Sequence, residues 1–244
     1  MTCSPKSIAL IIPAFNEADS IGVQLAQLPR SLFAQIIVVD NGSQDATAEV
    51  ARTAGAEVVR EPRRGYGRAC QAGLAHLRPE IDAVMFMDAD LSDHPADVTR
   101  LAHFFCADNW DLVTGSRVLG EAEAGSLTPV QRFGNWLTTR LILWIWSVSF
   151  TDLGPLRILS RDALRRLDLR DNDFGWNVEM QVKAARLGLR VAEIPVNYRR
   201  RRYGRSKISG TLTGSARAGV KILWTVFRQW QASRRQPGRI RSDR

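Results

Sequence analysis

Ser7-Ile-Ala-Leu-Ile-Ile-Pro13 is an apolar run close to the start of a chain of 244 residues. A short run of this kind, rich in β-branched residues, predicts a strand that is buried on both faces. A helical pattern follows it at about residues 19–28. The chain therefore opens with a strand and a helix, the unit from which α/β sheets are built.

The same alternation continues as far as Ser116. Further strands are predicted at residues 35–40, 57–60, 83–88 and 111–116. Helices are predicted between them, from a cap at Ser43 or Asp45 to Gly55, at about residues 67–77, and at residues 95–105. Short connections between alternating strands and helices indicate an α/β fold with a mostly parallel sheet and helices on both faces.

Polar side chains follow three of these strands at the point where each strand ends. They form the pairs Asn16-Glu17 and Asp40-Asn41 and the triplet Asp88-Ala-Asp90. Because ligands of such sheets bind beyond the carboxyl ends of the strands, the three groups predict a single site.

Asp88 and Asp90 are the sharpest feature of that site, and Asp93 and His94 follow closely. Two neighbouring carboxylates repel each other unless a cation neutralises them. Oxygen ligands at this spacing suit Mg²⁺ or Mn²⁺, with the diphosphate of a substrate completing the coordination. Such pairs are also common as helix caps, but the polar ends of the first two strands at the same edge favour a metal site.

Positive charge is concentrated at the end of the chain. Residues 199–244 hold 14 Lys and Arg and one acidic residue, a net charge of +13, whereas the preceding residues carry a net charge of −4. Such a segment attracts phosphorylated substrates, anionic lipid headgroups or nucleic acid. Residues 233–244 lack apolar periodicity and are expected to form a solvated basic tail. Three dispersed cysteines and the lack of a signal peptide favour a reducing, cytoplasmic location.

Two tryptophan-rich segments with flanking cations occupy residues 133–150 and 220–230. Their apolar runs are too short to span a membrane. Tryptophan beside cationic residues is typical of helices that lie at a membrane surface, although each segment alone is equally compatible with a core helix. The basic charge around the second segment favours peripheral attachment to the inner face of the membrane.

An ordered series of motifs adds to this reading. It comprises Ile12-Pro-Ala-Phe-Asn-Glu17, Val39-Asp-Asn-Gly-Ser-Gln-Asp45, Gly65-Tyr-Gly67, Asp88-Ala-Asp-Leu-Ser-Asp93, Gly115-Ser-Arg117, Asp152-Leu-Gly-Pro-Leu-Arg157, Phe174-Gly-Trp-Asn-Val-Glu179 and Tyr203-Gly-Arg-Ser-Lys207. With it the chain resembles the family 2 glycosyltransferases of GT-A fold, specifically the dolichyl-phosphate mannose and glucose synthase branch, over nearly all of residues 8–227.

The resemblance implies one GT-A catalytic domain over residues 1–232, with a donor half at 7–117 and an acceptor and interfacial part at 118–232. It also implies a role for individual residues: Pro13, Ala14, Glu17 and Asp40 for the nucleoside; Asp88 and Asp90 for the metal and the diphosphate, with Asp93 where relatives often carry Gln; Arg117 and Arg132 for an acceptor phosphate; Arg202 and Lys207 on a loop that closes over the diphosphate. Arg199, Arg200 and Arg201 are expected to be an exposed charge run.

The implied reaction is the inverting transfer of a hexose from a UDP- or GDP-sugar to a polyprenyl phosphate. A lipid phosphate needs no strong base, whereas a hydroxyl acceptor, the alternative, would need one, with Asp152 and Glu179 as candidates. A sugar-phosphate nucleotidyltransferase would want a glycine-rich cationic loop after the first strand. No nucleic-acid-binding module is recognisable, so nucleic acid is not an expected partner. A membrane protein partner or a second copy of the chain remains open.

Overall fold

The computed structural model describes residues 7–203 and 212–235. Within them one sheet has the strand order β3-β2-β1-β4-β6-β5-β7. The strands are β1 (Ile8–Ala14), β2 (Gln35–Asp40), β3 (Glu57–Arg60), β4 (Ala83–Phe86), β5 (Leu112–Ser116), β6 (Arg157–Ser160) and β7 (Val191–Pro195). Neighbouring strands are parallel except that β6 runs antiparallel to both β4 and β5. The predicted α/β class and mostly parallel sheet are confirmed.

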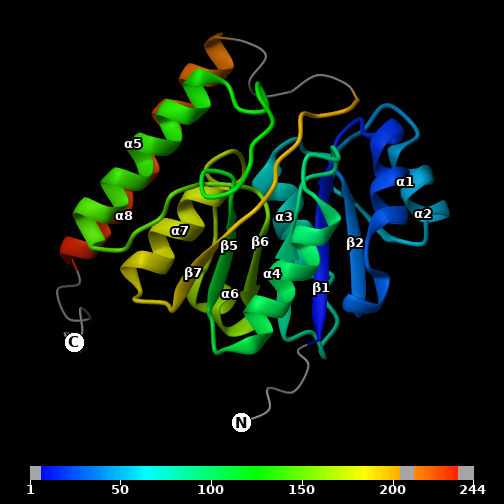
Figure 1. The fold of residues 1–244 in the computed structure, drawn as a ribbon, viewed down its shortest axis with the longest axis horizontal. Coiled ribbons are helices and arrows are strands. Elements are labelled where there is room, and N and C mark those ends of the chain that lie inside the picture. Colours follow the sequence, from blue (N-terminus) through cyan, green and yellow to red (C-terminus); the bar gives the residue numbers. More distant parts are fainter. Residues whose placement is uncertain (1–6, 204–211, 236–244) are drawn as a thin grey trace.

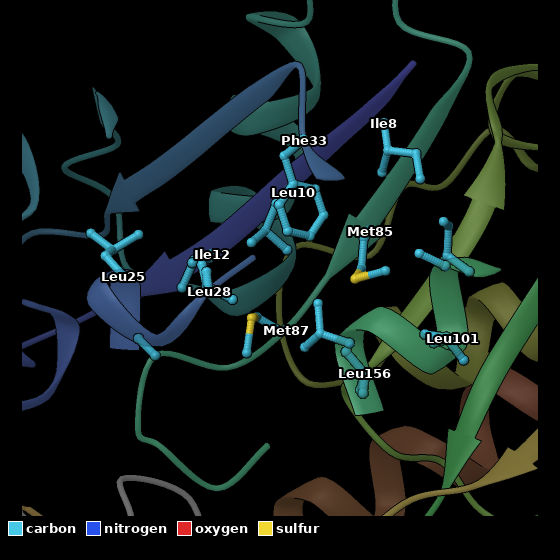
Figure 2. Close-up of a cluster of buried hydrophobic side chains, with 14 of the residues drawn as sticks. Ile8, Leu10, Ile12, Leu25, Leu28, Phe33, Met85, Met87, Leu101 and Leu156 are labelled. Atoms are coloured by element: carbon cyan, nitrogen blue, oxygen red, sulfur yellow. The ribbon is translucent and has the colours of Figure 1, made fainter. Parts of the chain in front are cut away.

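Helices cover both faces of this sheet. One face carries α1 (Ala18–Gln27), α2 (Thr47–Thr53) and α4 (Pro95–Ala107), and the other carries α3 (Tyr66–Ala75), α6 (Arg161–Leu167) and α7 (Trp176–Arg186); a short 3₁₀ turn, η1, spans Arg30–Leu32. Successive side chains of β1 point to opposite faces. Leu10 therefore belongs to the core that also contains Leu25 and Leu101 (Figure 2), while Ile11 belongs to the second core, with Cys70 and Met180.

The sequence pattern did not predict β6, α6, α7 and β7. β6 inserts antiparallel between β4 and β5, with Arg157 opposite both Phe86 and Thr114. A four-residue strand that begins with a fully buried arginine lacks the apolar run that marks a buried strand. This insertion brings Arg157 to the edge at which the parallel strands end.

Two long helices, α5 (Pro129–Trp146) and α8 (Leu212–Arg235), lie side by side at the β7 end of the sheet, far from α1 and α2 (Figure 1). They correspond to the two tryptophan-rich segments. A capping box between Thr128 and Gln131 starts α5, and Ser147 in the left-handed conformation ends it. α8 continues to Arg235, three residues into the predicted basic tail; residues 236–244 lie outside the described residues.

Each of these helices buries one face. Ile142 of α5 and Val226 of α8 form a small third core with Val178 and Val182 of α7. The predicted alternative of ordinary core helices is therefore correct for this face alone, because the opposite faces expose large apolar side chains. Within the described residues, every helix is either too short or too polar to cross a membrane.

Candidate functional site

A cavity of about 940 Å³ opens at the carboxyl edge of the sheet and continues toward α5 and α8. Its polar end is lined by Pro13, Ala14, Phe15, Glu17, Asn41, Arg64, Asp88, Asp90 and Arg117. Its other end is mostly apolar, with Val130, Phe133, Leu137, Phe174, Val178, Ile222 and Leu223. One cavity thus joins the strand ends to the paired helices.

The predicted nucleoside residues lie at the polar end. Pro13 and Ala14 close β1, and Glu17 begins the turn into α1 with its backbone N–H donating to the Thr47 hydroxyl at 2.8 Å. Asp40 is buried and accepts a hydrogen bond from the Ser43 backbone N–H at 2.9 Å. Its neighbour Asn41, rather than Asp40 itself, lines the cavity.

The Asp88-Ala-Asp90 turn is held firmly. The Gln24 side chain donates to the Asp88 carbonyl oxygen at 2.5 Å and accepts from the Leu91 N–H at 3.3 Å. Leu91 has a φ of 64°, a conformation that a leucine adopts only when its surroundings impose it. The buried Asp93 carboxylate lies behind this turn, where it accepts from the Asp88 N–H at 3.3 Å. Asp93 does not line the cavity.

These carboxyl groups are crowded. Burial, followed by the negative charge of Asp90, raises the pKa of Asp88 from its ordinary 3.8 to about 7. Burial, followed by the charges of Asp88 and Asp90, raises the pKa of Asp93 well above its ordinary value. Neighbouring cationic charge would therefore stabilise the ionised site.

Asp88, Asp90 and Asp93 do not form a complete set of metal ligands by themselves. In the part of the chain that the structure describes, no group of three or more His, Cys, Asp or Glu side chains is placed to hold a metal ion. The pair Asp88 and Asp90, open to the cavity, fits a cation whose remaining ligands come from a substrate.

Arg201 supplies positive charge at this site. Its guanidinium lies 2.6 Å from Glu17 Oε1 and 3.1 Å from Asp90 Oδ2. The backbone after β7 brings it there, because Arg199 donates its N–H to the Ser92 carbonyl and Tyr198 forms a bridge with Asp93. The expectation that Arg201 belongs to an exposed charge run is therefore wrong. No signal in the sequence marks Arg201, because it is one of four consecutive arginines that look alike until the backbone direction is known.

The cationic residues that were predicted to bind phosphate groups do not all lie at the cavity. Arg202 is exposed, and Lys207 lies outside the described residues. Arg132 is exposed on the first turn of α5 and is not among the residues that line the cavity. Of the three arginines predicted to bind phosphate groups, Arg117, Arg132 and Arg202, Arg117 alone lines the cavity.

Arg117 is held by Asp152. Its side chain makes two hydrogen bonds to that carboxylate, at 2.7 and 2.9 Å, and its backbone N–H makes a third at 2.8 Å. Burial favours the neutral form of each partner, but the hydrogen bonds and opposite charges outweigh it, so the pKa of Asp152 is lowered and that of Arg117 is raised. The Arg117 guanidinium also lies 4.9 Å from the centre of the Tyr198 ring.

The two carboxylates expected to serve as bases for a hydroxyl acceptor are occupied. Asp152 pairs with Arg117, and it is fully buried. Glu179 pairs at 2.8 Å with Lys183, one helical turn further on, and accepts hydrogen bonds from two backbone N–H groups. Neither carboxylate lines the cavity, whereas Asp173 does.

The middle of the cavity carries two polar residues that sequence reasoning did not single out. Tyr66 is the first residue of α3, and Asn177 lies in the first turn of α7. Burial, followed by the charge of Asp88, raises the pKa of Tyr66 well above its ordinary value, so its hydroxyl stays protonated. Their only sequence signal was membership of the motifs that begin at Gly65 and Phe174.

Comparison with known proteins agrees with this geometry. Residues 9–168 match the family described as Glycosyl transferase family 2. An uncharacterized glycosyltransferase of Mycobacterium tuberculosis is 38% identical over 222 residues, which cover 91% of this chain and 98% of that protein. An undecaprenyl-phosphate mannosyltransferase of Micrococcus luteus is 31% identical over 252 residues, covering 95% of this chain and 99% of that protein.

Among solved structures, glucosyl-3-phosphoglycerate synthase from Mycobacterium tuberculosis in complex with Mn²⁺, UDP and glucosyl-3-phosphoglycerate has a TM-score of 0.73 at 22% identity. The match covers 93% of this chain and 80% of that one. This likeness shows the GT-A fold. Together with the family match and the full-length relatives, it establishes that the chain belongs to glycosyl transferase family 2.

Proposed function

We propose that the chain transfers a hexose, with inversion, from a UDP- or GDP-sugar to a polyprenyl phosphate at the inner face of a membrane. The observation that carries this proposal is the shape of the cavity. It joins a carboxylate-lined sheet edge to an apolar passage between α5, α7 and α8, with Arg117 at the polar end. A phosphate joined to a long apolar chain needs both environments within one cavity.

The donor nucleotide would occupy the sheet edge beside Pro13, Ala14, Glu17 and Asp40. Glu17 is fixed there by Thr47 and by Arg201, so the edge is formed before a ligand arrives. In relatives of known structure UDP and Mn²⁺ are bound together, which supports a nucleotide-sugar donor here.

Asp88 and Asp90 are proposed to hold Mg²⁺ or Mn²⁺, with Asp93 supporting the turn from behind. The cation would neutralise the charge that develops on the diphosphate as it leaves. Two observations support a cation at Asp88 and Asp90. The carboxyl groups are crowded together, and Asp90 already attracts a positive charge, the Arg201 guanidinium at 3.1 Å. Diphosphate oxygens would complete the coordination that two side chains leave open.

Transfer breaks the bond between the anomeric carbon and the diphosphate oxygen, and the electron pair leaves with the nucleoside diphosphate. An oxygen of the acceptor phosphate forms the new bond from the opposite side. This oxygen is already an anion, so no side chain has to remove a proton. Arg117, fixed by Asp152, would orient the acceptor phosphate, and Arg201 and the exposed Arg202 would meet the departing charge.

The apolar end of the cavity opens beside an aromatic face that fits a lipid surface. This aromatic face comprises Phe133, Trp136, Leu143, Trp144, Leu223, Trp224 and Phe227, all of which are exposed. Arg132, Arg140 and Arg228, also exposed, lie on the same two helices. Exposed tryptophan with interspersed arginine favours an anionic bilayer over water. A lipid acceptor could then enter from the membrane without crossing water.

The alternative is a hydroxyl acceptor, which requires a general base. Since Asp152 and Glu179 are engaged elsewhere, Asp173 is the carboxylate of the acceptor side that faces the cavity. That position is the specific observation in favour of this alternative. It would make Asp173, rather than Arg117, the residue on which acceptor turnover depends most.

The test supplies undecaprenyl phosphate in anionic vesicles with Mn²⁺ and a panel of UDP- and GDP-sugars, and measures sugar in the organic phase. Undecaprenol, which lacks the phosphate, is the control acceptor. Arg117→Lys keeps the charge but loses the fork, and it should raise the acceptor KM about 10-fold while leaving donor affinity unchanged. Arg132→Lys tests the second predicted arginine in parallel. Transfer to undecaprenol or soluble alcohols alone, abolished in Asp173→Asn, would refute the phosphate acceptor.

A further inference from the structure

Both carboxylate oxygens of Asp90 already have a partner in the chain. Oδ1 accepts a hydrogen bond from the Ser92 N–H at 3.0 Å, and Oδ2 lies 3.1 Å from a terminal nitrogen of Arg201. The Ser92 contact belongs to the turn that places Asp90, whereas the Arg201 contact joins this turn to the distant segment after β7. A divalent cation at Asp90 would therefore compete with the Arg201 guanidinium for one negative charge.

Burial makes this competition strong. The Asp90 side chain is 8% exposed and that of Arg201 is 23% exposed, so water and salt screen their attraction only in part. Arginine keeps its charge at any ordinary pH, so Arg201 cannot give way to a cation by losing a proton. Two positive groups at one carboxylate repel each other. Binding of a free cation at Asp90 therefore requires the Arg201 guanidinium to move away.

Glu17 gives Arg201 a second anchor that allows such a movement. The other terminal nitrogen of Arg201 lies 2.6 Å from Glu17 Oε1, so each carboxylate binds a different end of the guanidinium fork. The contact with Asp90 can break while the contact with Glu17 remains. Glu17, Asp90 and Arg201 all line the cavity, at the end proposed for the diphosphate. The end of the fork that Asp90 releases would thus lie where a diphosphate oxygen can accept a hydrogen bond from it.

The charges balance only when the two exchanges occur together. A cation alone would leave half of the Arg201 fork beside a new positive charge, and a nucleoside diphosphate alone would meet the ionised Asp90. The cation and the diphosphate together give Asp90 a positive partner and Arg201 a negative one. We infer that Arg201 makes this site select a cation bound to a nucleoside diphosphate over the free cation. This inference rests on the cation site of the proposed function.

The first experiment measures Mn²⁺ binding in the absence of nucleotide, by electron paramagnetic resonance of the free ion. Arg201→Gln removes the competing charge and should bind Mn²⁺ about 10-fold more tightly than the wild type does. Arg201→Lys keeps the charge and should stay close to the wild type. Arg52→Gln, at an exposed arginine of α2 that does not line the cavity, is the matched control and should equal the wild type.

The second experiment titrates the same variants with UDP and GDP by calorimetry in saturating Mn²⁺. Since the cation then already holds Asp90, Arg201→Gln loses only the contact with the diphosphate and should bind the accepted nucleotide about 10-fold more weakly. The two experiments should therefore change in opposite directions. A merely structural role of Arg201 would not produce this result, because a loosened site would weaken the binding of both ligands.

Equal Mn²⁺ affinity in the wild type and Arg201→Gln would overturn the inference. An equal gain in Arg201→Gln and Arg201→Lys would overturn it too, because loss of the fork rather than of the charge would then admit the cation. Melting curves provide a third readout: Mn²⁺ alone should raise the Tm of Arg201→Gln by more than it raises that of the wild type, and the reverse order would count against the inference. A wild-type chain that binds no Mn²⁺, with or without nucleotide, would instead refute the cation site of the proposed function.

Discussion

The two ends of the cavity differ in how their side chains are exposed to water. At the sheet edge the buried charges are paired within the chain: Glu17 with Arg201, and Arg117 with Asp152. At the helical end the large apolar side chains are uncovered, with Trp144 82% exposed and Trp224 59% exposed. These two pairs are thus formed before any ligand binds, although the raised pKa values of Asp88 and Asp93 show that positive charge is still lacking beside them, whereas the aromatic face lacks a cover within the described residues. Chemistry and membrane attachment should therefore respond to different substitutions.

Substitution of Asp90 should give the largest difference between the two ends of the cavity. Asp90→Ala should reduce turnover roughly 1000-fold, because the variant loses one of the two carboxylates proposed to hold the cation. The same variant should bind anionic vesicles as the wild type does, since Asp90 lies at the other end of the cavity. Activity is measured by transfer to undecaprenyl phosphate and attachment by vesicle flotation. Asp108→Ala, an exposed carboxylate after α4, serves as the control.

Calorimetry decides whether the cation explains the loss. Nucleotide binding by the wild type should require Mn²⁺ and should be weak in EDTA. Equal nucleotide affinity in Mn²⁺ and EDTA would contradict the role given to Asp88 and Asp90, whatever the turnover of the variant.

A neighbouring pair of arginines offers the next largest effect. Arg201→Ala removes the cation beside Glu17 and Asp90 that is proposed to meet the departing charge, and losing about 2 kcal/mol of this transition-state stabilisation would lower kcat/KM about 30-fold. Arg202→Ala removes an exposed side chain and should have the smaller effect. Steady-state kinetics on both variants tests this order. A larger loss in Arg202→Ala would restore the original sequence-based assignment.

The polar end was largely predictable from sequence. Apolar runs with turn residues after them predicted strands β1 to β5 but not β6 and β7, and polar residues at three strand ends predicted the edge where Glu17, Asp40 and Asp90 gather. Parallel topology alone brings such ends together. What remained hidden was long-range: Arg201 reaches Asp90 only because the chain after β7 pairs with residues 92–93 and 121–123.

The helical end was only half predictable. Tryptophan and arginine at helical spacing marked α5 and α8, but the sequence could not tell which face of each helix is buried. The structure separates the two faces: Ile142 and Val226 contact α7, while Trp144 and Trp224 point outward. A similar limit applied to Asp152, because the sequence does not show that the fold brings Arg117 to this carboxylate.

The aromatic face gives a moderate expected effect. Trp144→Ala and Trp224→Ala should each weaken vesicle binding about 5-fold, because each removes a large apolar side chain from the contact with lipid. Phe104→Ala, which removes an exposed aromatic side chain from α4, is the matched control. Binding should also strengthen with anionic lipid and weaken with salt. If neither tryptophan variant binds vesicles more weakly than Phe104→Ala does, the aromatic face does not contact a bilayer.

The smallest expected effect is a pH dependence of stability in EDTA. The pKa of Asp88 is raised from 3.8 to about 7, first by burial and then by Asp90, so between these values the folded chain holds a proton that the unfolded chain releases. Stability from this group is complete below about pH 4 and is lost as the pH rises toward 7. Tm should therefore fall by a few degrees between pH 5 and pH 8.

Asp88→Asn should reduce this fall in Tm without abolishing it, because the pKa of Asp93 is raised in the same direction. Glu80→Gln, an exposed site before β4, should keep the wild-type slope. Mn²⁺ should flatten the slope in the wild type, since it favours the ionised carboxylates, and a slope that Mn²⁺ leaves unchanged would mean that the cation binds elsewhere.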